Sequence, residues 1–217
     1  MAGGPEVMRE RTQGGSDVSG GIFLDRDGVL CENRADYVKT WSEFKWIPGA
    51  LDALRMLAEL ELPIIMVTNQ SAVNRGLTTL EDVRDIHARM AADVRQAGGR
   101  VDAIYVCPHR PDEGCGCRKP GVLLFQTAAQ DLAVALERSY LIGDNLTDLE
   151  VGWALGLQVI LVRTGLGTGT ADRIRGDGRQ VLVLPDVADA ARWISAHRRP
   201  DLAAGTMRAR PGRTVRV

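Results

Sequence analysis

The 217-residue sequence lacks any uninterrupted apolar run near the roughly 18 residues that a membrane-spanning helix needs. Its first 21 residues are rich in glycine and charge and lack the apolar core of a secretion signal. A strong charge of either sign is also missing, because 27 basic and 28 acidic side chains leave a net charge of −1. This balance provides no overall field to attract nucleic acid or an anionic membrane. We therefore expect a cytoplasmic protein with neither of them as a partner.

The length fits a single domain with a substantial core. We expect a flexible segment at residues 1–19, a folded domain at 20–197 and a basic, disordered tail at 198–217. The tail carries many arginines against the single acidic residue Asp201, which favours solvated disorder over binding of RNA or acidic partners. The glycine-rich run from Gly165 to Gly169 lacks the following Lys-Ser/Thr of a phosphate-binding loop, so we expect a flexible connection there.

Six short apolar runs alternate with longer segments of helical periodicity. The expected strands are residues 21–24, 63–67, 101–106, 140–142, 159–162 and 181–184. The expected helices are residues 48–61, 78–97, 120–135, 146–155 and 187–196. The second helix opens on a capping box from Thr78 to Glu81. This alternation predicts an α/β fold in which helices cover both faces of a central parallel sheet.

Four of the predicted strands lead into polar residues that suit phosphate chemistry. In chain order these residues are Asp25, Asp27, Thr68, Asn69, Arg118, Lys119 and Asp144. The carboxyl ends of parallel strands share one edge of the sheet, where ligands bind, so we expect the residues to converge. Amides and cations can hold phosphate oxygens, while carboxylates can hold Mg²⁺. Each residue taken singly also fits a turn, a helix cap or a surface charge.

Asp25 and Asp27 stand two positions apart directly after the first apolar run. Alternation along an extended chain places such positions on the same side. One carboxylate can then act as a nucleophile and the other as a general acid and base. The alternative is a strand followed by an ordinary Asp-Gly turn.

The ordered segments DRDGV, VTNQS, CRKP and GDNLTD resemble the haloacid dehalogenase (HAD) superfamily of phosphatases, over about residues 20 to 168. The resemblance implies a HAD-like, Rossmann-like three-layer fold. It implies that Asp25 forms an aspartyl-phosphate and that Asp27 acts as general acid and base. It also implies that Thr68, Asn69, Arg118 and Lys119 bind the phosphorylated substrate. The implied Mg²⁺ ligands are Asp25, the backbone carbonyl of Asp27, and Asp144, with Asp148 supporting them.

Cysteine is scarce, and three of the four cysteines fall within eleven residues together with a histidine. The cluster consists of Cys107, His109, Cys115 and Cys117. Three thiolates and one imidazole form a complete four-coordinate zinc set, although the spacing is not that of the common fingers. With all positions filled by protein, the predicted zinc is structural and fixes the loop that leads into Arg118 and Lys119. A disulfide between Cys115 and Cys117 is not expected in a reducing cytoplasm.

Within the HAD superfamily, the zinc loop resembles the branch that contains heptose 1,7-bisphosphate phosphatases and histidinol-phosphate phosphatases. The run TNQSAVNRG at 68–76 is more similar to the heptose pattern. It departs from that pattern at Ala72, which stands for glycine, and Asn145 stands where many heptose enzymes carry lysine. The resemblance implies removal of the C7 phosphate from heptose 1,7-bisphosphate, a small phosphorylated sugar, and release of heptose 1-phosphate. We expect the protein to be a monomer. Histidinol phosphate, another sugar phosphate and a non-catalytic binding role remain as alternatives.

The segment from Leu30 to Ile47 is too short for a large cap domain, and we expect a flap beside the site. Its aromatic residues Tyr37, Trp41 and Trp46 suit either contact with substrate or simple packing of a surface loop. We assign Cys31 no role beyond packing. Arg75 and Arg163 are further candidates for substrate contact and fit surface cations equally well.

Overall fold

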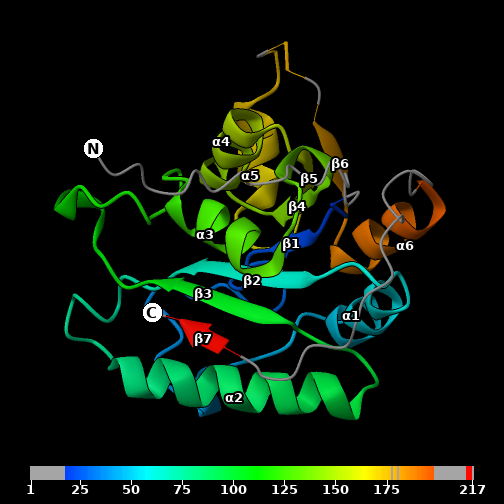
Figure 1. The fold of residues 1–217 in the computed structure, drawn as a ribbon. Coiled ribbons are helices and arrows are strands. Elements are labelled where there is room, and N and C mark those ends of the chain that lie inside the picture. Colours follow the sequence, from blue (N-terminus) through cyan, green and yellow to red (C-terminus); the bar gives the residue numbers. More distant parts are fainter. Residues whose placement is uncertain (1–17, 177, 180, 198–213, 217) are drawn as a thin grey trace, which may run out of the picture.

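A seven-stranded parallel sheet forms the middle layer of the structure (Figure 1). The computed structural model describes residues 18–176, 178–179, 181–197 and 214–216. The strands are β1 (Ile22–Leu24), β2 (Ile64–Asn69), β3 (Ala103–Cys107), β4 (Tyr140–Gly143), β5 (Gln158–Val162), β6 (Leu182–Leu184) and β7 (Thr214–Arg216). Their order is β6-β5-β4-β1-β2-β3-β7, so β1 lies between β2 and β4. The carboxyl ends of these three strands therefore meet at one edge.

The central strands bury side chains on both faces of the sheet. Ile22 and Leu24 of β1 pack into one hydrophobic cluster, whereas Phe23 between them packs into another. Successive side chains of a strand point to opposite faces, so a strand covered on both sides is apolar throughout. This accounts for the continuous apolar runs in the sequence.

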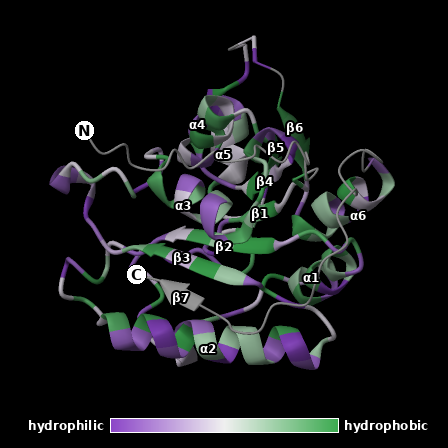
Figure 2. Ribbon diagram, in the orientation of Figure 1, coloured by the Kyte–Doolittle hydropathy of each residue, from purple (hydrophilic) through white to green (hydrophobic). Residues whose placement is uncertain are grey.

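Six helices form the two outer layers. They are α1 (Ala50–Ala58), α2 (Leu80–Gln96), α3 (Leu123–Leu132), α4 (Leu146–Leu155), α5 (Gly167–Arg173) and α6 (Val187–His197). Helices α1, α2 and α6 cover one face of the sheet, and α3, α4 and α5 cover the other (Figure 1). Figure 2 shows hydrophilic and hydrophobic residues alternating along α2, as expected for a helix that covers a sheet. The predicted three-layer α/β fold is confirmed.

Helix α5 corrects the expectation of a flexible connection at 165–169. The helix begins at Gly167 despite its glycines, and Gly167, Thr170 and Ala171 are buried. Packing against the sheet outweighs the poor helix propensity of glycine.

The N-cap of α2 lies one residue later than predicted. Thr79, rather than Thr78, is the N-cap, and its hydroxyl accepts from the backbone N–H of Asp82 at 3.1 Å. Asp82 in turn accepts from the backbone N–H of Thr79 at 3.0 Å. An aspartate therefore closes the capping box in place of the predicted Glu81.

Strand β7 is an element that the sequence did not predict. It pairs in parallel with β3 and lies within the segment expected to be a disordered tail. Of the segment expected to be flexible at 1–19, residues 1–17 lie outside the described residues, as do the tail residues 198–213 and 217.

No large cap domain interrupts the chain between β1 and α1, where a flap contains the short 3₁₀ helix η1 (Trp41–Glu43). The loop after β3 contains η2 (Pro111–Glu113), and η3 (Leu136–Arg138) precedes β4. Among the described residues, no helix combines the length and apolar character that crossing a membrane requires.

Candidate active site

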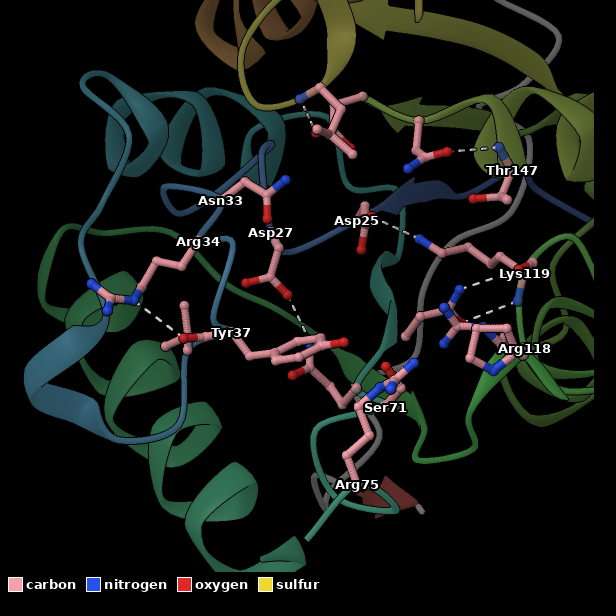
Figure 3. A pocket seen from close by; sticks show the side chains of 17 residues that line it. Asp25, Asp27, Asn33, Arg34, Tyr37, Ser71, Arg75, Arg118, Lys119 and Thr147 are labelled. Carbon is pink, nitrogen blue, oxygen red and sulfur yellow. Dashed lines mark hydrogen bonds and ion pairs between the residues drawn. The ribbon is translucent and has the colours of Figure 1, made fainter. Parts of the chain in front are cut away.

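A cavity of ≈ 280 Å³ opens at the edge where β1, β2 and β4 end (Figure 3). Asp25 and Asp27 line it from the end of β1, and Asn69 lines it from the end of β2. Arg118 and Lys119 enter from the loop that follows β3. The strand order thus brings together residues as far apart in the chain as Asp25 and Lys119, as the predicted parallel sheet requires.

Lys119 is a buried cation held between two carboxylates. Its Nζ lies 2.9 Å from Asp25 Oδ2 and 2.7 Å from Asp148 Oδ1, and it donates to the carbonyl oxygen of Val67 at 3.0 Å. Burial opposes the charged ammonium, but the attraction of Asp148 and Asp25 outweighs it and raises the pKa of Lys119. Lys119 is therefore positively charged at neutral pH.

Asn69 fixes the backbone of Lys119. Its side-chain oxygen accepts from the N–H of Lys119 at 3.1 Å, and its amide donates to the carbonyl of the same residue at 3.2 Å. Asn69 also lines the cavity. Asn69 was predicted to bind phosphate, and in the structure its side chain positions Lys119.

A cluster of carboxylates lies beside Lys119. Oxygens of Asp25, Asp144 and Asp148 lie within 4.8 Å of one another. Burial raises the pKa of Asp25 to about 6, with Lys119 opposing the shift. Burial and then the charge of Asp25 raise the pKa of Asp144 to about 8. Buried, mutually repelling carboxylates of this kind suit a divalent cation, and the oxygen donors are those that Mg²⁺ prefers.

Two glycines allow the chain to approach Asp144 closely. Gly28, with φ +83°, and Gly165, with φ +57°, pack so tightly that a Cβ atom on either would collide with the Asp144 carboxylate. The backbone N–H of Leu166 donates to Asp144 Oδ2 at 2.7 Å. The left-handed backbone at both positions favours glycine.

Asp27 lies apart from the carboxylate cluster and has its own partners. Arg26 Nη2 lies 2.9 Å from each carboxylate oxygen of Asp27, and Gln70 Nε2 donates to Oδ2 at 2.7 Å. The Cys31 thiol donates to Oδ1 at 3.4 Å, so this cysteine contacts a site residue as well as packing. The side chain of Asp27 is 24% exposed and lines the cavity.

Sequence reasoning missed the roles of Arg26 and Gln70, although both lie inside the segments that indicated the family. Thr68 does not line the cavity, and its hydroxyl instead accepts from Gln70 at 2.9 Å. The available signals were the polar run at the end of β2 for Gln70 and the position between two aspartates for Arg26.

The flap contributes a wall of the cavity. Arg34 and Tyr37 line it, and Tyr37 has a left-handed backbone with φ +66°. Arg34 Nε donates to the carbonyl of Tyr37 at 3.2 Å. Trp41 and Trp46 pack against the main hydrophobic cluster instead, so packing explains these two flap aromatics. Arg75 lines the cavity, whereas Arg163 is exposed and does not.

The predicted zinc residues converge in the loop after β3. Ligand atoms of Cys107, His109, Cys115 and Cys117 lie within 4.8 Å of one another, and the three thiols are free. His109 Nδ1 lies 3.1 Å from the Cys117 sulfur, and the Cys107 sulfur lies 3.7 Å from that of Cys115. Tetrahedral zinc with Zn–S bonds near 2.3 Å would place sulfurs about 3.8 Å apart, close to the 3.7 Å between Cys107 and Cys115 and wider than the 3.3 and 3.4 Å that separate Cys117 from these two. The four residues therefore fit a closed four-coordinate metal site.

Arg118 connects this cluster to the cavity. Its Nη1 donates to the carbonyl oxygen of His109 at 3.2 Å, while the side chain lines the cavity. The cluster thus holds a cation beside the carboxylates.

Comparison with known proteins agrees with this geometry. Residues 116–190 match the model of the HAD-hydrolase-like family. The chain is 39% identical over 173 residues to the D-glycero-beta-D-manno-heptose-1,7-bisphosphate 7-phosphatase of Pseudomonas putida, covering 80% of this chain and 98% of that protein. It is 41% identical over 135 residues to the D-glycero-alpha-D-manno-heptose-1,7-bisphosphate 7-phosphatase of Mycobacterium tuberculosis, covering 60% of this chain and 70% of that protein.

A similar solved structure is D,D-heptose 1,7-bisphosphate phosphatase from Bordetella bronchiseptica, complexed with magnesium and phosphate. Its TM-score is 0.76 at 36% identity, and the match covers 81% of this chain and 97% of that one. The fold, the carboxylate–lysine site and these relatives together show that the chain belongs to the heptose 1,7-bisphosphate phosphatase family of HAD-type phosphoric monoester hydrolases.

Proposed function

We propose that the protein removes the C7 phosphate of D-glycero-D-manno-heptose 1,7-bisphosphate and releases heptose 1-phosphate for nucleotide-activated heptose synthesis. The observation that carries the chemistry is the ion pair between Lys119 and Asp25 at 2.9 Å, beside Asp144 and in the same cavity as Asp27. The names of the relatives carry the choice of substrate.

In the first step, a carboxylate oxygen of Asp25 attacks phosphorus and forms an aspartyl-phosphate. The bond from phosphorus to the sugar oxygen breaks, and Asp27 gives that oxygen a proton. Lys119 orients Asp25 and offsets the charge of the transferring phosphoryl group.

In the second step, Asp27 takes a proton from water, whose oxygen attacks phosphorus. The bond from phosphorus to Asp25 breaks, releasing inorganic phosphate and restoring both carboxyl groups. The side chain of Asp27 is 24% exposed, so water can reach it. Asp27 is therefore the general acid of the first step and the general base of the second, and it ends the cycle with the proton that it began with.

Mg²⁺ is the proposed cofactor, held by Asp25, Asp144 and the backbone carbonyl of Asp27, and supported by Asp148. It would supply positive charge at the phosphate oxygens when bound. The carboxylate cluster and the raised pKa of Asp144 support this assignment, as does the magnesium in the Bordetella structure.

Zinc is the proposed structural metal at Cys107, His109, Cys115 and Cys117. The closed ligand set leaves no position for a reacting water. Thiolate ligands must stay reduced, which suits the proposed cytoplasmic location.

Arg118 is the proposed contact for the sugar or its second phosphate, with Arg75 as a further cation of the cavity. Asn69 remains a proposed phosphoryl contact because it lines the cavity, although its amide donates to Lys119. Thr68 was also predicted to bind the phosphoryl group, but it is buried behind Gln70 and would have to be exposed by a local rearrangement to do so. All these groups come from one chain, so a monomer suffices for the reaction.

Phosphate release with Mg²⁺ tests the proposal. The substrates are the α and β anomers of heptose 1,7-bisphosphate, measured separately, together with histidinol phosphate and fructose 1,6-bisphosphate. The Asp25→Asn variant, checked for unchanged fold and zinc content, is the blank. We expect a preference for one heptose anomer. A preference for histidinol phosphate would overturn the heptose assignment and leave the phosphatase chemistry standing, whereas silence with every ester would overturn both.

A further inference from the structure

Arg26 is a charged residue with no exposure to solvent, and it is the largest fully buried side chain among the described residues. It stands between the two aspartates of the site, where its neighbours in the sequence face the cavity. Burying a guanidinium is costly unless it is paired and its N–H groups are satisfied. The partners of Arg26 should therefore show why a charged residue is buried at this position.

The guanidinium of Arg26 and the amide of Gln70 surround the carboxylate of Asp27. Arg26 Nη2 is 2.9 Å from both Asp27 oxygens, and Nε is 3.3 Å from Oδ1. Gln70 closes the arrangement, since its oxygen accepts from Arg26 Nη2 at 2.9 Å while its nitrogen donates to Asp27 Oδ2 at 2.7 Å. Two rigid, planar groups thus fix the orientation of Asp27.

His87 holds the far side of Arg26. It lies on α2, is 1% exposed, and its Nε2 is 3.2 Å from Arg26 Nη1. A guanidinium only donates hydrogen bonds, so Nε2 of His87 must accept and the ring must be neutral, with its proton on Nδ1. Burial, followed by the charge of Arg26, lowers the pKa of His87 well below its ordinary value, in agreement with a neutral ring.

The second ring nitrogen of His87 has no hydrogen-bond partner among the described residues. A buried donor without a partner costs stability, and an apolar residue of similar size would avoid that cost. The contact with Arg26 is therefore the one polar interaction in the described structure that favours histidine at this position.

We propose that His87 is a positioning residue for the reaction: its neutral imidazole holds Arg26, which together with Gln70 holds Asp27 in the orientation for proton transfer. This inference rests on the proposed role of Asp27. His87 touches neither substrate nor the reacting atoms, and it acts through two residues. General acid–base catalysis contributes about 10²- to 10⁴-fold, so a partly misplaced Asp27 should lose part of that factor.

Two variants of similar length separate the hydrogen bond from packing. Gln in His87→Gln keeps an acceptor near the position of Nε2, whereas Met in His87→Met fills similar space without one. Two esters separate proton transfer from attack: a primary sugar phosphate needs a proton on its leaving oxygen, whereas p-nitrophenyl phosphate releases a stable anion. Release of the alcohol is measured in a single turnover with enzyme in excess, so the measured rate does not depend on the later attack of water.

We expect His87→Met to slow the first turnover of the sugar phosphate by ~10- to 100-fold and that of p-nitrophenyl phosphate by less than ~3-fold. His87→Gln should remain within ~3-fold of the wild type on both esters. Equal losses on the two esters in His87→Met, or identical behaviour of the two variants, would overturn the proposal. The test can use any primary sugar phosphate that the wild type hydrolyses. Failure to hydrolyse heptose bisphosphate would contradict the proposed substrate, but the losses of His87→Met on another sugar phosphate and on p-nitrophenyl phosphate could still be compared.

A spectroscopic measurement on the wild type does not depend on how the variants fold. The chain has three histidines, so long-range ¹H–¹⁵N spectra of the imidazoles are simple to assign. We expect His87 to be neutral at pH 7 with its proton on Nδ1. A proton on Nε2, or a charged ring, would contradict the contact with Arg26 and overturn the proposal.

Discussion

Arg118 donates a hydrogen bond to the carbonyl oxygen of His109 at 3.2 Å. One residue belongs to the lining of the cavity and the other to the proposed zinc cluster. The cluster therefore determines where a substrate-facing cation lies, even though its own ligand atoms do not take part in the proposed reaction.

Loss of zinc should weaken substrate binding more than it slows the chemistry. We expect chelation or Cys115→Ser to raise the KM for heptose bisphosphate by ~10-fold, because Arg118 loses its fixed position and a charged hydrogen bond contributes about 1.5–3 kcal/mol. Metal analysis should find one zinc per chain in the wild type, and added zinc should restore the KM after chelation. An unchanged KM in zinc-free protein would contradict the link through His109.

Removal of the Arg118 charge should also raise the KM, without loss of the zinc. Arg118→Met should raise the KM for the bisphosphate by ~10-fold and leave kcat within ~3-fold. The matched control is Arg110→Met, because Arg110 lies in the same loop but pairs with Asp112 and Glu113 and does not line the cavity. Equal effects of the two substitutions would show that loop structure, rather than the charge of Arg118, sets the KM.

Lys119→Met should abolish turnover and destabilise the fold. It leaves Asp25 and Asp148 buried without their shared cation, and breaking a buried pair in this way costs about 3–5 kcal/mol. Urea unfolding measures the loss, and Lys45→Met at an exposed position is the control. Adding Asp148→Asn to Lys119→Met should recover part of the free energy of unfolding, since one unpaired charge is removed. No recovery would argue against charge as the cause.

The raised pKa of Asp144 predicts how stability without metal depends on pH. The ordinary value is 3.8 and the folded-state value is about 8, so between these pH values the folded state binds more protons than the unfolded state. The free energy of unfolding contributed by this group therefore falls as pH rises from about 4 to about 8. In metal-free buffer at pH 8, Asp144→Asn should melt roughly 4 °C or more above the wild type, and the gap should shrink towards pH 5.

Magnesium should reverse that order at pH 8. Bound Mg²⁺ stabilises the wild type by mass action and cannot bind as well when Asp144 is replaced. Thermal melting with and without Mg²⁺ at pH 5 and pH 8 measures this, and the Mg²⁺ effect should be larger at pH 8 because protons compete for the carboxylate. A larger effect at pH 5 would contradict the assignment of Asp144 as a ligand.

Most of the secondary structure could be read from the chain, because apolar periodicity reports which faces are buried. All six predicted strands are present, and α4 has the predicted bounds Leu146–Leu155. Helix α5 was missed because its glycines mask a helix that packing stabilises. Strand β7 was missed because its hydrogen bonds to β3 join segments about 110 residues apart, and no local pattern records such a pairing.

The sequence alone determined the alternation of strands and helices and the order of the polar segments that follow them. It also determined the cluster of three cysteines and one histidine, because these residues lie within one short loop. These features depend on local spacing, which the chain carries directly.

Only the tertiary structure decided which side chains touch. The placement of β1 between β2 and β4 brings Lys119 against Asp25 and Asp148 and sets Gln70 against Asp27. The same packing buries Arg26 against His87 of α2, a contact between residues 61 positions apart. Contacts at such separations depend on the order of the strands and on the shape of the packed layers, and neither property is contained in the periodicity of any single segment.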